Sequence, residues 1–419
     1  MSVRAGADVN PRLKSACEMP READYDIVLF GATGFTGELT AQALLSQMPT
    51  GARWALAGRS RGKLAAVRER LAAIDSGAAG LALLTADVGD PATIAALAAS
   101  TRVLISTVGP YLLRGEAIVA ACAEAGTDYL DLCGEPEFVD LMYLRYHQRA
   151  RETGARLVHS CGFDSVPYDL GALFTVGEIP DAADSPIALE GFALAKGSLS
   201  GGTYHSLVGA LGRLKESGRV GRQRRSVERH APDGKLAEGR RVHGISGRTH
   251  KDRLAGGWVV ALPTIDPQQV LRTARLNERY GPDFSYAHYM VTRKLTTTVG
   301  FGARVVLLAM LAQVGPTRRI LLRLKRQGSG PSEAKRAKSF FRVRFRAQVG
   351  GEDPRVLITE VSGGDPGYGE TAKILAQSGL CLAFDEVPAP GGGQWSPALA
   401  LGQPLIDRLT KAGIVFRVI

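Results

Sequence analysis

Residues 26–37 read Asp26-Ile-Val-Leu-Phe-Gly31-Ala-Thr-Gly34-Phe-Thr-Gly37, and this stretch decides the fold. The apolar run before the first glycine predicts a buried parallel strand, and a helical pattern follows the third glycine. Gly31 permits a tight turn, Gly34 lets a pyrophosphate approach the backbone, and Gly37 lets the helix lie close to the strand. Phosphates would then face the free N–H groups of the helix. The spacing differs from G-x-G-x-x-G, so a tight turn without a ligand is the alternative.

The composition is that of a globular protein with two or three domains. The chain has 419 residues, of which 45% are hydrophobic and 22% are charged. Its net charge of +11 suits anionic lipids or phosphorylated cofactors. Nucleic acid is not an expected partner, because the sequence has no aromatic-rich basic motif, no zinc-ligand spacing and no helix-turn-helix pattern.

The cysteines and the N-terminal tail indicate a reducing compartment. The five cysteines are scattered without a C-x-x-C pair, which is typical of a reduced cytoplasmic protein. They are Cys17, Cys122, Cys133, Cys161 and Cys381. Residues 1–23 are polar and contain two prolines, so we expect a flexible tail rather than a signal peptide.

Strands and helices alternate over residues 24–170, which predicts an α/β fold with a Rossmann-like, doubly wound parallel sheet. The expected strands are 26–30, 53–57, 81–85, 102–106, 128–132 and 156–159. Each strand ends in small or polar residues, and ligands bind at that edge of an open parallel sheet.

The pattern changes after Gly171, and residues 171–362 predict a second, α+β domain built on a mixed or antiparallel sheet. Residues 187–196 predict one of its strands. The strict alternation from Phe341 to Arg346 predicts a half-buried strand with its arginines on the wet face, and residues 356–361 are expected to pair with it. A helix at 370–378 and a strand at 414–418 are expected in the last segment.

Residues 215–253 are rich in arginine and poor in apolar residues. One interpretation is a solvated, mobile insertion, and the other is a surface for an anionic partner or a membrane. After this region, Asp266 is expected to be the N-cap of a helix, with Pro267 at its first position and Gln269 completing a capping box.

Residues 295–315 are apolar and long enough to span a bilayer. Arg304 near the centre makes a span costly, so a buried helix or a helix on the membrane surface is favoured. A basic run follows, and the whole segment 295–338 resembles a membrane-surface element.

The end of the second strand predicts the cofactor. NAD-binding folds usually carry a carboxylate there to hold the ribose 2′-hydroxyl, whereas this chain has Arg59. A guanidinium can bind a 2′-phosphate through two hydrogen bonds, so NADP(H) is predicted. A solvent-facing role for Arg59 is the alternative. Asp87, after the third strand, could meet the adenine or cap the next turn.

Four motifs occur together and in order: G-A-T-G-F-T-G at 31–37, A-G-R at 57–59, T-V-G-P-Y at 107–111 and C-G-F-D-S-V-P at 161–167. In this combination the chain resembles the saccharopine dehydrogenase-like oxidoreductases. Within them it resembles the trans-acting enoyl reductases that serve polyketide synthases in cell-envelope lipid synthesis. The likeness runs from Asp26 to the C-terminus, but the family also contains saccharopine reductases.

The resemblance implies that segment 363–419 returns toward the NADP-binding domain. The residues it implies around the pyrophosphate are Gly31, Thr33, Gly34, Phe35, Thr36 and Gly37, with Arg59 beside the 2′-phosphate. Those implied at the ribose and nicotinamide are Thr107, Val108, Gly109 and Tyr111, with Cys161, Gly162, Phe163 and Asp164 on the far side of the nicotinamide pocket.

Enoyl reduction needs a hydride, a hydrogen-bond donor for the thioester oxygen and a proton for the α-carbon. Tyr111 is the predicted catalytic residue, because it lies at the mouth of the fourth strand; a ring that only packs against the cofactor is the alternative. Further candidates are Tyr168, Tyr204, His205 and Lys196. We expect no metal site and no nucleophilic role for a cysteine, since hydride transfer needs no covalent step.

Three functions remain open on the sequence. The first is an enoyl reductase for a lipid or polyketide intermediate bound to a carrier protein, and the second is a saccharopine-type oxidoreductase for an amino or imino acid. The third is a non-catalytic NADP-binding protein at membranes or lipid bodies. The expected location is the cytoplasm, with peripheral contact at the inner face of the plasma membrane, and a homodimer is one expected assembly.

Overall fold

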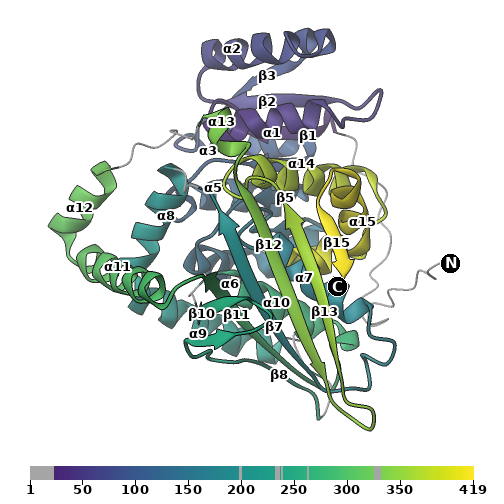
Figure 1. Ribbon diagram of the computed structural model, residues 1–419. Helices are drawn as coiled ribbons and strands as arrows, with labels where there is room; N and C mark the ends of the chain where they lie inside the picture. Colours follow the sequence, from purple (N-terminus) through teal and green to yellow (C-terminus); the bar gives the residue numbers. More distant parts are fainter. Residues whose placement is uncertain (1–22, 198–200, 232–235, 237–238, 262–263, 325–331) are drawn as a thin grey trace.

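A computed structural model describes residues 23–419 except 198–200, 232–235, 237–238, 262–263 and 325–331. The predicted tail, apart from Ala23, and Cys17 lie outside the described residues. Two sheets organise the rest of the chain, and helix α7 (Val166–Gly177) lies between them (Figure 1).

The first sheet is parallel throughout and has the order β14-β6-β5-β4-β1-β2-β3. Its strands are β1 (Tyr25–Phe30), β2 (Trp54–Gly58), β3 (Ala82–Thr85), β4 (Thr101–Ser106), β5 (Asp128–Asp131), β6 (Arg156–Val158) and β14 (Gly393–Trp395). The six strands expected at the start of the chain are all present, and the last strand comes from the C-terminal segment. The predicted Rossmann-like fold is therefore confirmed.

Helices cover both faces of this sheet, because successive residues of a strand point to opposite sides. Ile27 and Leu29 of β1 pack into one core, and Val28 and Phe30 pack into the other. The helices are α1 (Phe35–Leu45), α2 (Arg61–Ala72), α14 (Gly369–Phe384) and α15 (Pro397–Lys411) on the first core, and α3 (Pro91–Ala99), α5 (Glu116–Ala125) and α6 (Pro136–Thr153) on the second. The short helix α4 (Tyr111–Arg114) follows β4.

The second sheet is mixed, with the order β15-β13-β12-β7-β11-β10-β9 and β8 beside β11. Its strands are β7 (Ile187–Lys196), β8 (Arg241–Gly244), β9 (His250–Asp252), β10 (Gly257–Ala261), β11 (Asp283–Thr292), β12 (Phe340–Val349), β13 (Arg355–Gly363) and β15 (Val415–Val418). Strand β7 is parallel to β11 and antiparallel to β12. The α+β second domain predicted from the sequence matches this arrangement.

The alternation along β12 was interpreted correctly. Phe341, Val343 and Phe345 are buried in the core beneath the sheet. The arginines on the other face are opposite carboxylates in the neighbouring strands: Arg344 pairs with Glu360 at 3.0 Å, and Arg346 pairs with Glu190 at 2.6 Å. Charges directly opposite each other stabilise the sheet pairing and leave these arginines occupied.

Residues 215–253 do not form a mobile insertion where the structure describes them. Helix α9 (Leu214–His230) packs against α6, and β8 and β9 belong to the second sheet. Arg224 is 2% exposed, with its Nη1 atom 2.7 Å from the Asp140 carboxylate and its guanidinium 4.4 Å from the centre of the Tyr143 ring. The expected solvated character holds for other arginines of the helix, since Arg222 and Arg225 are exposed, whereas the paired Arg224 fills a contact that an apolar residue usually fills.

Candidate functional site

The glycine turn between β1 and α1 has the geometry of a phosphate cradle. Gly31 has a φ of +93°, which side chains rarely adopt, and a Cβ on Gly37 would lie 2.2 Å from the carbonyl oxygen of Gly31. Gly34 is exposed and is the N-cap of α1, without a side chain to bind the free N–H groups. These donors and the open backbone fit a pyrophosphate.

Thr107 holds this turn in place from the neighbouring strand β4. Its hydroxyl group lies 3.1 Å from the carbonyl oxygen of Gly31 and 3.3 Å from that of Phe30, and donates to them. A Cβ on Gly31 would lie 2.6 Å from the same hydroxyl. The residue predicted to border the ribose thus supports the cradle. Val108 follows it, and its N–H donates to Ser106 Oγ at 3.3 Å.

Arg59 follows β2 at the edge of the sheet where the glycine turn lies. Its side chain is exposed and makes no hydrogen bond or ion pair within the described part of the chain. Ser60 caps α2 by accepting from the N–H of Lys63. A free guanidinium beside a helix N-terminus fits a 2′-phosphate.

Asp87 was expected either to meet the adenine or to cap the next turn, and its contacts fit the capping role. Its carboxylate accepts from the N–H of Gly89 at 2.9 Å, and its own N–H donates to Thr93 Oγ1 at 3.1 Å. These bonds form a turn before α3, as expected for an aspartate at such a position. The side chain is half-buried, with one carboxylate oxygen engaged in this way.

The contacts of Tyr111 do not fit its predicted catalytic role. Its hydroxyl donates to the carbonyl oxygen of Ser106 at 3.1 Å and accepts from the N–H of Leu132 at 3.2 Å. Burial and the nearby Asp131 raise its pKa well above the usual value. Since backbone groups occupy the hydroxyl on both sides, Tyr111 joins the ends of β4 and β5 and is not placed to donate to a substrate.

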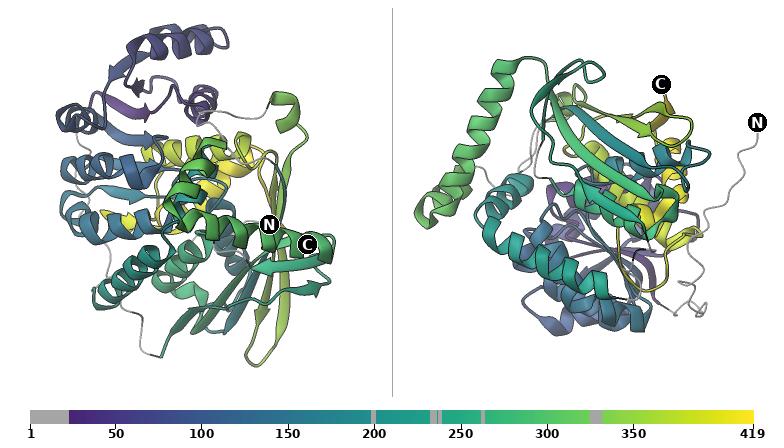
Figure 2. Two further views of the ribbon diagram at one scale, coloured as in Figure 1. Left: turned by 90° about the vertical axis from the view of Figure 1, so that its left-hand side faces the viewer. Right: turned by 90° about the horizontal axis from the view of Figure 1, so that it is seen from below.

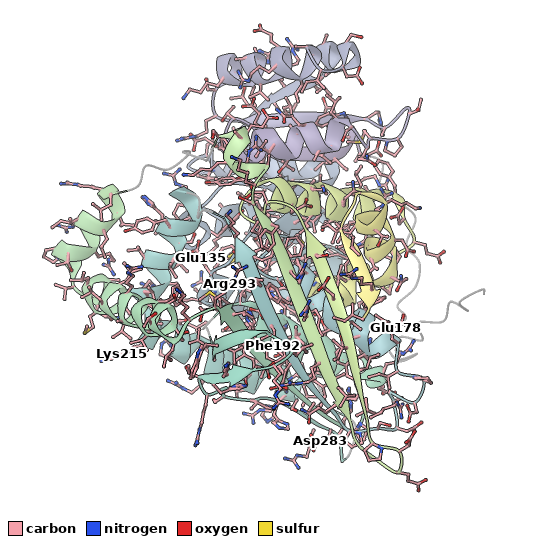
Figure 3. All side chains as sticks on the ribbon, in the orientation of Figure 1. Glu135, Glu178, Phe192, Lys215, Asp283 and Arg293 are labelled. Atoms are coloured by element: carbon pink, nitrogen blue, oxygen red, sulfur yellow. The ribbon has the colours of Figure 1, made fainter. Side chains whose placement is uncertain are left out.

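Glu135, which the sequence analysis missed, supports the same region. Its carboxylate accepts from the N–H groups of Tyr111 at 3.1 Å and Leu112 at 3.0 Å, and from the hydroxyl of Ser206 at 2.6 Å. It therefore caps helix α4 and ties it to helix α8 (Gly201–Leu211). Figure 3 labels Glu135 close to α8. A glutamate four residues after a strand gives no sequence signal for this role.

The loop after β6 contributes Cys161 to Asp164. The thiol of Cys161 is fully buried, and burial raises its pKa, so a nucleophilic role is not favoured. A Cβ on Gly162 would lie 3.0 Å from Leu132, and the Phe163 ring packs between Tyr168 and Phe341. These residues form a wall at the end of the first sheet.

Asp164 differs from its neighbours because solvent reaches its side chain. Desolvation by the surrounding protein, together with the charge of Asp266, raises the pKa of its carboxyl to about 6. A carboxyl with a pKa near neutrality can donate and recover a proton under ordinary conditions.

Tyr168, Asp266 and His288 form a buried cluster beside Asp164. The Tyr168 and His288 rings are 4.8 Å apart, and Nδ1 of His288 lies 2.9 Å from Oδ2 of Asp266. Within the described residues, Nε2 of His288 has no hydrogen-bond partner, and the hydroxyl of Tyr286 donates to Oδ2 of Asp266 at 3.4 Å. Burial, Asp266 and Asp164 raise the pKa of Tyr168 well above its usual value.

Asp266 is therefore not the helix N-cap that the sequence indicated. Helix α10 (Asp266–Leu276) begins at this residue, Ile265 is its N-cap, and no side chain caps it. The Asp266 carboxylate instead accepts from the hydroxyl of Thr264 and bonds His288. A buried carboxylate paired to a histidine orients the ring and fixes its tautomer.

The remaining candidates lie elsewhere. Lys196 is exposed at the end of β7, and Tyr204 packs in a small apolar cluster on α8. His205 follows it on the same helix, where the two rings are 6.2 Å apart. A cavity of about 580 Å³ at the far end of the second sheet is lined by Pro186, Asp283 and Arg355 among others, and contains none of the predicted site residues.

The C-terminal segment closes the cofactor side of the site. The Tyr368 ring meets the Phe35 ring edge-on at 4.8 Å, and Arg336 of helix α13 (Glu333–Arg336) lies 5.9 Å above that ring. Thr371 of α14 accepts from the N–H of Phe163 at 3.3 Å. The G-D-P-G-Y loop and α14 thus bring the glycine turn and the Cys161–Pro167 loop together.

Comparison with known proteins identifies relatives along nearly the whole chain. Residues 27–158 match the saccharopine dehydrogenase NADP binding domain. The chain is 37% identical to a protein of Mycobacterium tuberculosis provisionally named a trans-acting enoyl reductase, over 94% of this chain and 97% of the relative. It is 30% identical to an Arabidopsis thaliana protein provisionally named a mitochondrial saccharopine dehydrogenase-like oxidoreductase, over 95% and 97%.

Solved structures of known proteins share the fold, and one of them matches along nearly the whole chain. Apo saccharopine dehydrogenase (L-Glu forming) from Saccharomyces cerevisiae superposes with a TM-score of 0.52 at 12% identity, covering 94% of this chain and 99% of that chain.

Proposed function

The chain belongs to the NADP-binding, saccharopine dehydrogenase-like oxidoreductases, and from this membership we propose that it is a trans-acting enoyl reductase. It would reduce a C=C bond of a lipid or polyketide thioester, delivered on a carrier protein. The name of the Mycobacterium tuberculosis relative supports this reaction. The chemistry of the residues beside the Cys161–Asp164 loop also supports it.

The observation that carries the proposal is the cluster of Asp164, Tyr168, Asp266 and His288. Among the described side chains of this cluster there is no lysine or arginine, and two members are carboxyls. An amino or imino diacid needs cations to bind its carboxylates, and here it would meet like charges. A neutral thioester meets no such repulsion.

The chain's own residues supply what hydride transfer leaves to the protein. Bound NADPH supplies the hydride, and the glycine turn, Arg59 and the Thr107–Gly109 segment would hold it. The hydride adds to the β-carbon, and the electron pair of the C=C bond moves toward the thioester oxygen. The hydroxyl of Tyr168 donates a hydrogen bond to that oxygen.

Asp164 donates the proton that the α-carbon receives. Its pKa of about 6 leaves a usable fraction protonated near neutrality, and its exposure to solvent lets it recover the proton after each turnover. Asp266 and His288 act as positioning residues, since the paired imidazole packs against the Tyr168 ring.

A direct test is to titrate the protein with NADPH and NADH, and then to offer enoyl thioesters of increasing acyl length and a cyclic imine. NADPH oxidation by a thioester, lost in Asp164→Asn with NADPH binding intact, is the expected result. Oxidation by the imine alone would favour the saccharopine-type alternative. Failure to bind NADPH would contradict both reactions.

A further inference from the structure

Two helices lie at the edge of the molecule with little protein around them. They are α11 (Leu295–Gln313) and α12 (Gly315–Leu324); α11 and α12 project outward beyond helix α8 on the left of Figure 1, and α11 lies at the outer edge in the right-hand view of Figure 2. By length and composition α11 could cross a membrane, since its most apolar 18-residue stretch has a mean hydropathy of 1.7. Only 11% of the residues in that stretch are buried inside the protein. An apolar helix this exposed is unusual in a protein whose other long helices pack against the sheets or against one another.

The exposed side of α11 is an apolar stripe. Four of its large residues recur at helical spacing and are more than half exposed: Val299 62%, Val306 58%, Leu307 52% and Met310 58%. Val314, directly after the helix, is 52% exposed. The stripe continues on α12 with Ile320 and Leu324. Seven large apolar side chains on one surface would be stable only against an apolar partner.

The opposite side holds the helices in a fixed orientation. Ala312 of α11 and Leu321 of α12 are buried against Val208 and Leu211 of α8. The side-chain amide of Gln313 donates to the carbonyl oxygen of Leu211. Because the inner face is packed and hydrogen-bonded to the body, the apolar stripe cannot turn inward.

Charge indicates what covers the stripe. The sequence contains no acidic residue between Asp283 and Glu333. The basic side chains exposed on or next to these helices are Arg293, Lys294, Arg304, Arg319 and Arg323. Apolar residues flanked by basic ones, without acidic residues, match the acyl and headgroup layers of an anionic bilayer.

We propose that α11 and α12 form a docking arm that lies flat in the interface of an anionic membrane. The apolar stripe enters the acyl boundary, and the exposed arginines meet the headgroups. A transmembrane orientation is disfavoured, because Arg304 lies in the middle of α11 and the inner face of the helix is attached to α8. Long arginine side chains reach the headgroups from an interfacial helix.

The arm adjoins the candidate site. Helix α8, which carries the arm, bonds Glu135 through Ser206, and α13 beyond α12 places Arg336 over Phe35 of the cofactor turn. The residues of the stripe are themselves separate from both the cofactor turn and the Asp164 cluster. Membrane binding and NADPH binding can therefore be measured independently on the same variants.

The test is flotation of the full chain with vesicles of phosphatidylcholine alone and of phosphatidylcholine mixed with an equal amount of phosphatidylglycerol. We expect the wild-type protein to float only with the mixed vesicles. The triple variant Val306→Ser, Leu307→Ser, Met310→Ser should bind at least ~100-fold more weakly. Reversal of charge in Arg319→Glu, Arg323→Glu should weaken binding by roughly 30-fold or more.

The matched control is Arg222→Glu, Arg225→Glu, which reverses two exposed charges on α9 instead. It should float like the wild type, and all variants should keep their affinity for NADPH, which shows that they are folded. If the control variant lost as much vesicle binding as Arg319→Glu, Arg323→Glu, the binding would depend on net charge and not on the arm, and the proposal would be overturned. Undiminished flotation of the triple variant would also overturn the proposal, whether or not that variant changes from dimer to monomer.

Discussion

The Asp266 carboxylate and the His288 imidazole form a buried pair in which Oδ2 lies 2.9 Å from Nδ1. The other nitrogen of the ring, Nε2, has no partner among the described residues. The His288 ring contacts Tyr168, and desolvation together with the Asp266 charge raises the pKa of Asp164. Four residues from three segments thus act as one electrostatic unit.

The first prediction concerns Asp164. Its pKa in the folded protein is raised to about 6, above that of an exposed aspartate, so the proton is held more tightly in the folded state. The catalytic acid is lost as the pH rises through about 6, and kcat/KM should fall tenfold per pH unit above it. The variant Asp164→Asn should lose about 10²–10⁴-fold in kcat and show no such limb.

The same shift makes a statement about stability. A raised aspartate pKa contributes stability that is present at low pH and is lost as the pH rises through the folded value. The Tm of the wild type relative to Asp164→Asn should therefore decline between about pH 4 and pH 6. An unchanged difference in Tm across that range would show that the carboxyl is not perturbed.

The second prediction tests the coupling between Asp266 and Asp164. The variant Asp266→Asn keeps the shape of the side chain and removes its charge, which raises the pKa of Asp164 in the wild type. The alkaline limb of kcat/KM should then move to lower pH, and kcat should fall by about 10–100-fold. A purely structural role for Asp266 would lower the activity without moving the limb.

The third prediction separates two tyrosines. In Tyr168→Phe the donor for the thioester oxygen is lost, so kcat should fall by about 10²–10³-fold with little change in Tm. In Tyr111→Phe the backbone groups of Ser106 and Leu132 lose their partner, so stability should fall by about 1–3 kcal/mol while kcat changes little. Thermal melts and initial rates on both variants check the assignment, and the opposite pattern would restore Tyr111 as the catalytic residue.

The fourth prediction concerns cofactor choice. Arg59→Ala removes an exposed guanidinium that has no partner in the described chain. The Kd for NADPH should rise by about 10–100-fold, whereas that for NADH should stay within about twofold. Fluorescence titration measures both values, with Lys411→Ala on a distant helix as the control. Equal loss for the two cofactors would mean that Arg59 does not bind the 2′-phosphate.

The fifth prediction compares two glycines. A Cβ at Gly37 would lie 2.2 Å from the carbonyl oxygen of Gly31, so Gly37→Ala must move the turn. It should weaken NADPH by at least ~10-fold and cost about 1–3 kcal/mol of stability. At Gly62, in the exposed first turn of α2, nothing lies within 4 Å of a Cβ. There the substitution to alanine should stabilise the protein by about 0.5–1 kcal/mol and leave the cofactor affinity intact.

Much of the fold could be predicted because its signals are local. The strand and helix alternation of the first domain, the alternating strand at Phe341–Arg346 and its partner all follow from the positions of apolar residues along the chain. The prediction for the basic region was wrong where it expected a mobile insertion. Arg224 pairs with Asp140, which is 84 residues away in the sequence, and no local pattern indicates that pairing.

Tyr111 shows the same limit within the site. Its place at the end of a strand was predicted correctly, but its role depends on the backbone groups that its hydroxyl meets. Backbone hydrogen bonds leave no trace in the side-chain pattern, so a catalytic and a structural tyrosine look alike in the sequence.

The sequence alone predicted NADP(H) as the cofactor and predicted the glycine turn and Arg59 as residues that hold it. The glycine turn and Arg59 lie within 29 residues, and their conformations follow from the missing Cβ atoms and the charge that they carry. Only the tertiary structure decided which groups form the cluster that we propose acts in the reaction. Tyr168, Asp266 and His288 lie far apart in the chain, and it is the packing of the second sheet and α10 against α7 that brings them into contact.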